Sequence, residues 1–314
     1  MDISVVIPAY NEESNIIPIC DEVIASLNKM DVTYEIVLVD DGSSDNTFNI
    51  MNQVAGKFDC IKVIKFKKNY KKSAAYMAGF KESDGSIIVT MDADLQDDPS
   101  EIGKMIDLIG RYDAVIGWKE NRLDTVSKVL PSKIFNWINK KLFAIDLKDN
   151  DSGFRVMKRE AVSELNLYGD LYRFIPALLA SKGYSVTETS VNHRLRYSGK
   201  SKYGYSRFLT GLLDILTMKL IIDFTNRPSH LFGYMALGMI SIGLISELIA
   251  IFYKVFLGHL FITHMPIIIF GVMTIILGAS FFGIGLLGEL IVHQTRSKDL
   301  YEIDKDLVTH TPIN

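Results

Sequence analysis

Residues 86–99 read SIIVTMDADLQDDP, an apolar run rich in β-branched residues that ends in four carboxylates within seven positions. The run predicts a buried strand over 86–92 that stops where the charge begins. Elsewhere in the first half of the chain, similar short runs alternate with segments of helical spacing. The predicted strands cover 3–8, 35–40, 61–66, 86–92 and 114–118, and the predicted helices cover 13–28, 46–58, 73–81 and 99–109. This alternation predicts an α/β domain built around a mainly parallel sheet with helices on both faces.

Polar clusters follow three of these predicted strands. They are PAYNE at 8–12, DDGS at 40–43 and DAD at 92–94. DDGS alone is typical of a plain turn, but ligands of such sheets bind beyond the carboxyl ends of the strands. The three clusters together therefore predict one nucleotide-binding site at this edge. Two further strands are predicted at 152–157 and 186–194.

The acidic segment 92–98 favours a divalent cation, because crowded carboxylates repel one another unless a cation lies between them. Alternate residues of an extended segment face the same way, so Asp92, Asp94 and Gln96 can converge on one Mg²⁺ or Mn²⁺ ion whose remaining positions suit phosphate oxygens. The alternative is a solvated turn in which Asp98 caps a helix that starts at Pro99. The two interpretations are compatible, because the cap does not need Asp92 or Asp94.

Phosphate groups at this site need side-chain cations, because the chain contains neither GxGxxG nor GxxxxGK[ST]. Dinucleotide oxidoreductases and P-loop NTPases therefore lose their main sequence support. A basic segment at 194–207 either folds over a phosphate or attracts anionic lipids. Its basic residues are Arg194, Arg196, Lys200, Lys202 and Arg207. A second basic run, 65–72, predicts a solvated face.

Charge and cysteine content exclude other classes. A net charge of −3 argues against a nucleic-acid partner. Cys20 and Cys60 have no metal-ligand spacing, which makes structural zinc and a disulfide framework improbable. The N-terminus lacks a basic stretch followed by a long apolar run, so no signal peptide is predicted.

Two apolar runs, 231–253 and 266–288, are long enough to cross a bilayer as helices. The preceding segment 205–224 has amphipathic spacing, and it either lies in the membrane interface or packs on the soluble domain. Glu247 lies inside the first run, where it either contacts another helix or reaches the far interface.

The distribution of basic residues predicts the orientation of these spans. Lys254 is the one lysine or arginine between the two runs, whereas Arg227 precedes the first and Arg296 and Lys298 follow the second. The positive-inside rule then predicts that both termini and the large domain are cytosolic.

With these features, the chain resembles glycosyltransferase family 2. Within this family it resembles the polyprenyl-phosphate glycosyltransferases of the dolichol-phosphate mannose synthase and bactoprenol glucosyltransferase type. Five motifs in order carry the resemblance: VVIPAYNE at 5–12, VDDGS at 39–43, MDADLQDDP at 91–99, DSGFR at 151–155 and GKSKY at 199–203. The resemblance covers nearly the whole chain.

The resemblance implies a Rossmann-like GT-A fold and a role for each motif. It implies a base and ribose pocket at Pro8, Tyr10, Glu12 and Asp41, a metal site at Asp92, Asp94 and Gln96, a sugar and acceptor region at Asp151 and Arg155, and an acceptor loop containing Arg196, Ser201 and Lys202.

Two positions depart from the family pattern. Trp118 and Lys119 stand where a small residue and arginine are usual, so the diphosphate is neutralised by Lys119, Arg122 or Lys128. Lys71 stands where the family commonly has glycine, which makes the local backbone conformation an open question.

The implied reaction is an inverting, metal-dependent transfer of a sugar from a UDP-sugar or GDP-sugar to a membrane polyprenyl phosphate. A processive polysaccharide synthase is disfavoured because the chain lacks a QxxRW motif, and a non-catalytic nucleotide-sugar sensor would not need Asp92 and Asp94. The expected organisation is an integral membrane protein, either a monomer or a homo-oligomer. It would have a catalytic domain at 1–204, an interfacial helix and linker at 205–228, a transmembrane hairpin at 229–292 and a cytosolic tail at 293–314.

Overall fold

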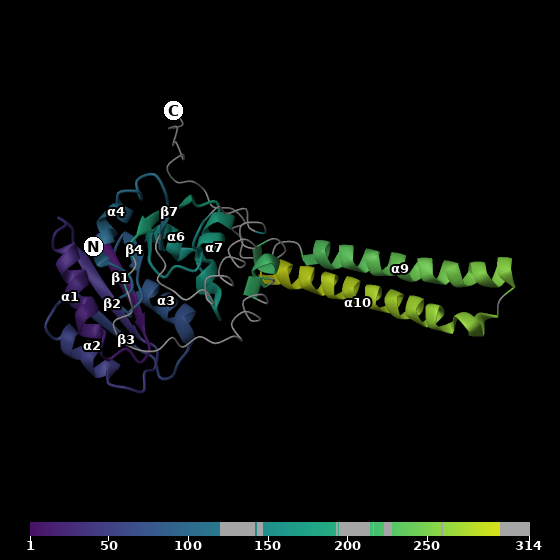
Figure 1. The fold of residues 1–314 in the computed structure, drawn as a ribbon, viewed down its shortest axis with the longest axis horizontal. Coiled ribbons are helices and arrows are strands. Elements are labelled where there is room, and N and C mark those ends of the chain that lie inside the picture. Colours follow the sequence, from purple (N-terminus) through teal and green to yellow (C-terminus); the bar gives the residue numbers. More distant parts are fainter. Residues whose placement is uncertain are drawn as a thin grey trace, which may run out of the picture. The chain divides into compact units, whose positions relative to one another are not determined.

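The computed structural model describes residues 1–119, 142, 147–192, 194, 214–215, 217–222, 228–258 and 260–295. The chain divides into two compact units, Met1–Lys219 and Leu220–Asn314. Figure 1 shows the sheet and helices of the first unit and the two long helices of the second.

A seven-stranded sheet forms the centre of the first unit, in the order β3-β2-β1-β4-β6-β5-β7. The strands are β1 (Ile3–Ala9), β2 (Tyr34–Asp40), β3 (Ile61–Lys65), β4 (Ile87–Thr90), β5 (Ala114–Lys119), β6 (Arg155–Lys158) and β7 (Val186–Val191). β6 pairs antiparallel with β4 and β5, and the other pairs are parallel. The predicted mainly parallel sheet is confirmed, with one reversed strand between two parallel groups.

Helices whose apolar residues recur at helical spacing cover the sheet. The buried residues of α1 (Ile16–Leu27) are Ile16, Ile19, Cys20, Val23 and Leu27, which form one stripe of the core. Further helices of this unit, within the residues that the structure describes, are α2 (Thr47–Ala55), α3 (Lys71–Glu82), η1 (Pro99–Glu101), α4 (Ile102–Ile106), α6 (Arg159–Ser163), η2 (Leu171–Phe174) and α7 (Ile175–Ser181).

Two predicted boundaries are wrong for local reasons. The helix predicted from residue 13 begins at Ile16, because the chain first makes a turn in which the backbone N–H of Asn15 donates to the carbonyl of Glu12 at 2.9 Å. The helix predicted over 99–109 is the 3₁₀ turn η1 followed by the short α4. Glycines at 103 and 110 lower the helix propensity of this stretch.

The second unit is a hairpin of two helices, α9 (Pro228–Leu257) and α10 (Met265–Thr295), joined through the short 3₁₀ helix η3 (Phe261–His264). The predicted runs 231–253 and 266–288 lie inside them. Both helices are long and apolar enough to cross a membrane, and only 22% and 17% of their most apolar windows are buried. A core helix of a soluble protein would be mostly buried, so the exposed apolar surface favours lipid as its surroundings.

Small residues at seven-residue spacing allow α9 and α10 to approach closely. Ala236, Gly243 and Ala250 lie on α9, and Gly271, Gly278 and Gly285 lie on α10. A Cβ on Gly278 would lie 2.9 Å from the carbonyl oxygen of Ala236, so a larger side chain would force the helices apart. Close approach through small residues is a common basis of helix association in membranes.

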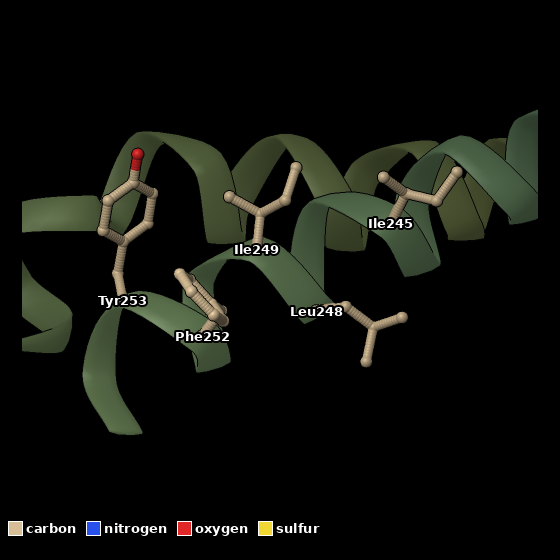
Figure 2. Close-up of a pocket in the computed structure, with 5 residues that line it drawn as sticks. All are labelled: Ile245, Leu248, Ile249, Phe252 and Tyr253. Carbon is tan, nitrogen blue, oxygen red and sulfur yellow. The ribbon is translucent and has the colours of Figure 1, made fainter. Parts of the chain in front are cut away.

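Glu247 faces α10 in this hairpin. A Cβ on Gly271 would lie 2.5 Å from Glu247 Oε1, and this oxygen is buried. Of the two alternatives for Glu247, the structure therefore shows the helix contact. On α9, an open apolar hollow is lined by Ile245, Leu248, Ile249, Phe252 and Tyr253 (Figure 2). Its lining is typical of a surface that contacts lipid chains.

The described part of the segment before the hairpin is helical over 214–215 and 217–222. Ile215 and Met218 are buried, and Lys219 Nζ donates to the carbonyl oxygen of Leu142 at 2.8 Å. This part therefore packs against protein, as the alternative for segment 205–224 had it. The rest of that segment lies outside the described residues.

Candidate active site

The loops that follow β1 and β2 are joined at the carboxyl edge of the sheet. The backbone N–H of Asn11 donates to Ser43 Oγ at 2.9 Å, and Asn11 Oδ1 accepts the backbone N–H of Ser44 at 2.8 Å. Asn11 has a φ of 53°, a left-handed conformation that asparagine tolerates better than most residues. These contacts bring the clusters at 8–12 and 40–43 together, as the topology predicts.

Asp41 and Gly42 hold the loop that follows β3. Asp41 is buried, and its Oδ1 accepts the backbone N–H of Tyr70 at 2.7 Å. Burial raises the pKa of Asp41, although N–H groups of Tyr70 and Lys71 act in the opposite direction. Gly42 has a φ of 68°, and a Cβ there would overlap the main chain of Lys68. Three loops are thus packed together around the predicted base and ribose pocket.

Lys71 has a φ of 72°, so the lysine adopts the conformation expected of the glycine that is common at this position in the family. A left-handed conformation costs a non-glycine residue about 1 kcal/mol. We expect Lys71→Gly to stabilise the first unit by up to about that amount, less the extra entropy of glycine in the unfolded chain. Thermal unfolding in detergent should show a higher Tm. Lys68→Gly, at an exposed lysine of ordinary φ in the same loop, should not raise it, and a lower Tm for Lys71→Gly would contradict the assignment of strain.

Asp92, Asp97 and Asp98 form ion pairs with basic side chains among the described residues. The pairs are Asp92 with Lys72, Asp97 Oδ1 with Lys119 Nζ at 3.1 Å, and Asp98 Oδ1 with Arg194 Nη2 at 2.8 Å. Basic side chains therefore lie beside the crowded carboxylates, and a divalent ion bound at this segment stays a prediction. The chain itself supplies much of the neutralising charge.

Asp98 caps the helix that follows it, as predicted. Its Oδ1 accepts the backbone N–H of Ser100 at 3.0 Å. Burial opposes ionisation of Asp98, but Ser100 and Arg194 outweigh it and lower the pKa of this carboxyl. Arg194 also pairs with Glu22 Oε2 at 2.6 Å and donates its backbone N–H to the carbonyl of Gln96 at 3.0 Å. Arg194 thus ties the start of the basic segment 194–207 to the acidic loop.

Asp94 is the carboxylate that suits a divalent ion best. It is 7% exposed, its Oδ1 accepts the backbone N–H of Gln96 at 3.2 Å, and Leu95 between them has a φ of 61°. Strained turns of this kind gather at functional sites. The described residues contain no group of three His, Cys, Asp or Glu side chains that could hold a metal ion. An ion at Asp94 therefore needs further oxygen ligands from a bound phosphate group, which is how Mg²⁺ commonly binds.

The motif at 151–155 packs directly against Asp92. A Cβ on Gly153 would lie 2.6 Å from Asp92 Oδ1, so glycine is needed where the motif passes this carboxylate. Arg155 follows in β6, opposite Thr90 of β4, and is 0% exposed. None of its guanidinium nitrogens has a hydrogen-bond partner among the described residues. Arg155 is thus a buried cation near Asp92 and does not line an open surface.

Positive charge determines the ionisation of Asp92. Burial opposes ionisation, yet Lys72, Lys119 and Arg155 hold the pKa of Asp92 below its usual value. Lys119 also interacts with Asp94 and Asp97. Three carboxylates and three basic side chains therefore lie close together here, and their charges roughly cancel. A diphosphate and a divalent ion bound together would preserve this balance better than either alone.

Arg173 is a second buried cation, located beside Asp151. Its Nε lies 3.8 Å from Asp151 Oδ1, and its Nη1 lies 3.9 Å from Asp214 Oδ2. Arg173 comes from η2, whereas Asp214 comes from the helix that leads toward the hairpin. The guanidinium therefore connects the 151–155 motif to the last helical part of the first unit.

The structure thus gathers most of the predicted residues along one edge of the sheet. Pro8 is the second-last residue of β1 and pairs with Val39 of β2, and Glu12 Oε2 accepts a hydrogen bond from Asn15 Nδ2 at 2.6 Å. Lys119 pairs with Asp97 in the acidic segment. Its contact with a diphosphate stays a prediction. Other predicted residues lie outside the described ones, namely Arg122, Lys128, Arg196, Ser201 and Lys202.

Sequence reasoning missed Lys72, Arg173 and the anchoring role of Arg194. Most of the basic run 65–72 is exposed as expected, but Lys72 points toward Asp92. The sequence contained part of this information, because Lys72 is the last lysine of the run and is followed directly by the small and apolar residues of α3. Arg173 lies in an apolar stretch, LYRFIPALLA at 171–180, where a lone charge indicates a buried ion pair.

Comparisons with known proteins agree with this architecture. The family model described as glycosyl transferase family 2 matches residues 4–165. The chain is 31% identical to a dodecaprenyl-phosphate galacturonate synthase of Rhizobium johnstonii, over 93% of this chain and 88% of that protein. It is 32% identical to an undecaprenyl-phosphate 4-deoxy-4-formamido-L-arabinose transferase of Shewanella sediminis, over 98% and 92%.

Among solved structures, the glucosyl-3-phosphoglycerate synthase of Mycobacterium tuberculosis in complex with Mn²⁺, UDP and phosphoglyceric acid has a similar fold. Its TM-score is 0.55 at 18% identity, and the match covers 69% of this chain and 78% of that one. This likeness confirms the predicted GT-A fold. With the family match over half the chain and relatives that align over nearly all of it, the protein belongs to glycosyl transferase family 2 and is a glycosyltransferase.

Proposed function

We propose that this enzyme transfers a sugar from a nucleoside diphosphate sugar to the phosphate of a membrane polyprenol. The observation that carries the proposal is the extent of similarity to transferases named for dodecaprenyl and undecaprenyl phosphate, which continues through the apolar hairpin. A soluble acceptor would not require two helices of this length and hydropathy. The hairpin holds the catalytic unit at the bilayer where a lipid phosphate resides.

The chemistry requires positioning more than a general base. A phosphate monoester has a second pKa of about 6 and is largely ionised at neutral pH, so its oxygen is already a nucleophile. Direct attack at the anomeric carbon breaks the bond to the nucleoside diphosphate and inverts the configuration. Asp151 orients the reacting partners, and Lys72, Lys119 and Arg155 stabilise the charge of the leaving diphosphate.

Mg²⁺ or Mn²⁺ bound at Asp94, with Asp92 and Gln96 nearby, would neutralise part of the diphosphate charge. The protein of similar fold was solved in complex with Mn²⁺ and UDP, which supports a divalent ion and a nucleotide as ligands of this enzyme. Asp41 and the joined loops at 8–12 and 40–43 form the side of the site that receives the base and ribose.

The positive-inside rule supports a cytosolic catalytic unit, with the domain and segment boundaries given from the sequence. Nucleotide sugars are then available on the same side as the lipid phosphate. Cysteine-accessibility labelling of a single cysteine placed in the loop near Gly258 would test this orientation. Labelling from outside intact cells is expected, and protection there with labelling from the cytosolic side would contradict the proposed topology.

A donor panel tests the reaction itself. Membranes containing the protein are incubated with polyprenyl phosphate, MnCl₂ and individual UDP- or GDP-sugars, and the lipids are extracted. At least one donor should label the lipid, and the Asp94→Asn variant serves as the matched control. NMR of the product should show the anomeric configuration opposite to that of the donor. Retained configuration would contradict direct attack.

We expect Lys202→Ala to reduce transfer to polyprenyl phosphate by about tenfold or more, because a charge-assisted contact with a reacting phosphate contributes more than attraction to a lipid surface. Nucleotide affinity should remain near that of the parent. The assay uses detergent and a short, soluble prenyl phosphate, which removes the anionic bilayer. Lys65→Ala, at an exposed lysine, is the control. A Lys202→Ala variant as active as the parent would show that the charge of this loop serves only the membrane surface.

A further inference from the structure

The Lys72–Asp92 ion pair is more exposed to solvent than the Lys119–Asp97 pair of the same acidic segment. The side chains of Lys72 and Asp92 are 21% and 35% exposed. In the Lys119–Asp97 pair the lysine is 17% exposed and the carboxylate only 1%. The Asp92 carboxylate is therefore open to solvent, where a ligand can reach it, whereas the Asp97 carboxylate is closed.

The backbone on both sides of Lys72 is held in place. The preceding turn contains Lys71 in its left-handed conformation, and the N–H of Tyr70 is bonded to Asp41 Oδ1. On the other side, Ser73 Oγ accepts the backbone N–H of Tyr172 at 3.1 Å. The first turn of α3 thus presents the Lys72 side chain to the site from a fixed base.

Two aromatic rings lie close to the Lys72 ammonium group. Its Nζ lies 5.5 Å from the centroid of the Tyr76 ring and 5.1 Å from that of Tyr172. Both distances are within the range of cation–π attraction. Tyr76 and Tyr172 are buried, so packing holds both rings in place beside the ammonium group.

We propose that Lys72 is a displaceable counter-ion, which holds Asp92 in the absence of ligand and moves to a donor phosphate when a divalent ion arrives with the nucleotide. The proposal rests on the proposed function for the identity of the donor. Asp92 cannot serve a divalent ion fully while an ammonium group occupies it. A diphosphate offers the ammonium a new anionic partner, so the two ligands favour each other's binding.

This arrangement predicts opposite effects of one substitution on two ligands. Lys72→Met keeps an unbranched, mostly apolar side chain that is one heavy atom shorter than lysine, but removes the charge that competes for Asp92. The affinity for Mn²⁺ alone should then rise, by about tenfold at low ionic strength, because one positive charge no longer lies beside the carboxylate. The affinity for UDP or GDP in the presence of Mn²⁺ should fall, because the diphosphate loses a cation.

The experiment measures free Mn²⁺ by electron paramagnetic resonance during titration of the full-length protein in detergent, without substrate. Lys71→Met is the matched control, because it removes the same charge one residue away at an exposed position, and its Mn²⁺ affinity should equal that of the parent. Lys72→Arg retains the charge and should bind Mn²⁺ no more tightly than the parent. The double variant Lys72→Met/Asp92→Asn should lose the gain, since the gain depends on the freed carboxylate.

Unchanged or weaker Mn²⁺ binding by Lys72→Met would overturn the inference, and so would a gain that persists when Asp92 is replaced. A failure to bind Mn²⁺ in every variant would overturn it as well, because a freed Asp92 beside Asp94 should suffice for weak binding. These outcomes are independent of the acceptor. The proposed transfer to a lipid phosphate is tested by the lipid product, and the Mn²⁺ titration does not test it.

Discussion

Asp94→Asn is expected to reduce sugar transfer by about a thousandfold or more while the protein remains folded. The amide can still accept the backbone N–H of Gln96, which Asp94 Oδ1 accepts at 3.2 Å, so the turn at Leu95 should persist. What is lost is the charge that holds a divalent ion against the departing diphosphate. Initial rates with saturating donor and lipid, and thermal unfolding of the same preparation, measure the two properties.

Asp98→Asn is a suitable control for this prediction. It removes the same charge four residues later, at a carboxylate that caps η1 and pairs with Arg194. A cap and a partly exposed ion pair contribute about 1 kcal/mol each, so its activity should fall far less. Full activity of Asp94→Asn, or of the parent enzyme in excess EDTA, would refute the assignment of a metal ion to Asp94.

The second large effect is expected for Arg155→Met. Arg155 is 0% exposed, and its guanidinium nitrogens bond to no described residue. The substitution removes a buried charge that has no hydrogen-bond partner among the described residues, and keeping such a charge buried costs free energy in the folded state. We expect the free energy of unfolding to stay within about 1 kcal/mol of the parent value, or to rise.

The catalytic activity of Arg155→Met should fall, although its stability should not. Asp92 loses one of the three cations that hold its pKa down, and the leaving diphosphate loses a fixed positive charge in a water-excluded environment. A fall in kcat of about a hundredfold is expected, which corresponds to about 2.7 kcal/mol of transition-state stabilisation. Arg155→Lys should recover part of it by retaining the charge. Normal kcat in Arg155→Met would show that the arginine only fills space in the sheet.

The sequence predicts the sheet and the apolar hairpin because each depends on a periodic pattern. The alternation of apolar runs and helical spacing over residues 3–118 needs no tertiary information. The cap at Asp98 is local too, since it depends on Pro99 and on a partner two residues away. These predictions match the structure apart from their boundaries and the reversed strand β6.

Long-range contacts are what the sequence does not reveal. Arg194 pairs with Glu22, which is 172 residues away in the chain, and no local pattern predicts that partner. Lys72 belongs to a basic run whose other members are exposed, and its direction follows from the left-handed turn at Lys71. The need for glycine at 153 likewise becomes evident only when Asp92 is seen beside it.

The most direct test of the account is the mass of the lipid product formed from polyprenyl phosphate and an accepted donor, together with the nucleotide released. The account predicts that the lipid gains one sugar residue without an additional phosphate, and that a nucleoside diphosphate is released. The absence of a lipid product across UDP- and GDP-sugars would contradict it. A gain of a phosphosugar with release of a nucleoside monophosphate would contradict it as well, because the bond broken would then lie within the diphosphate and not at the anomeric carbon.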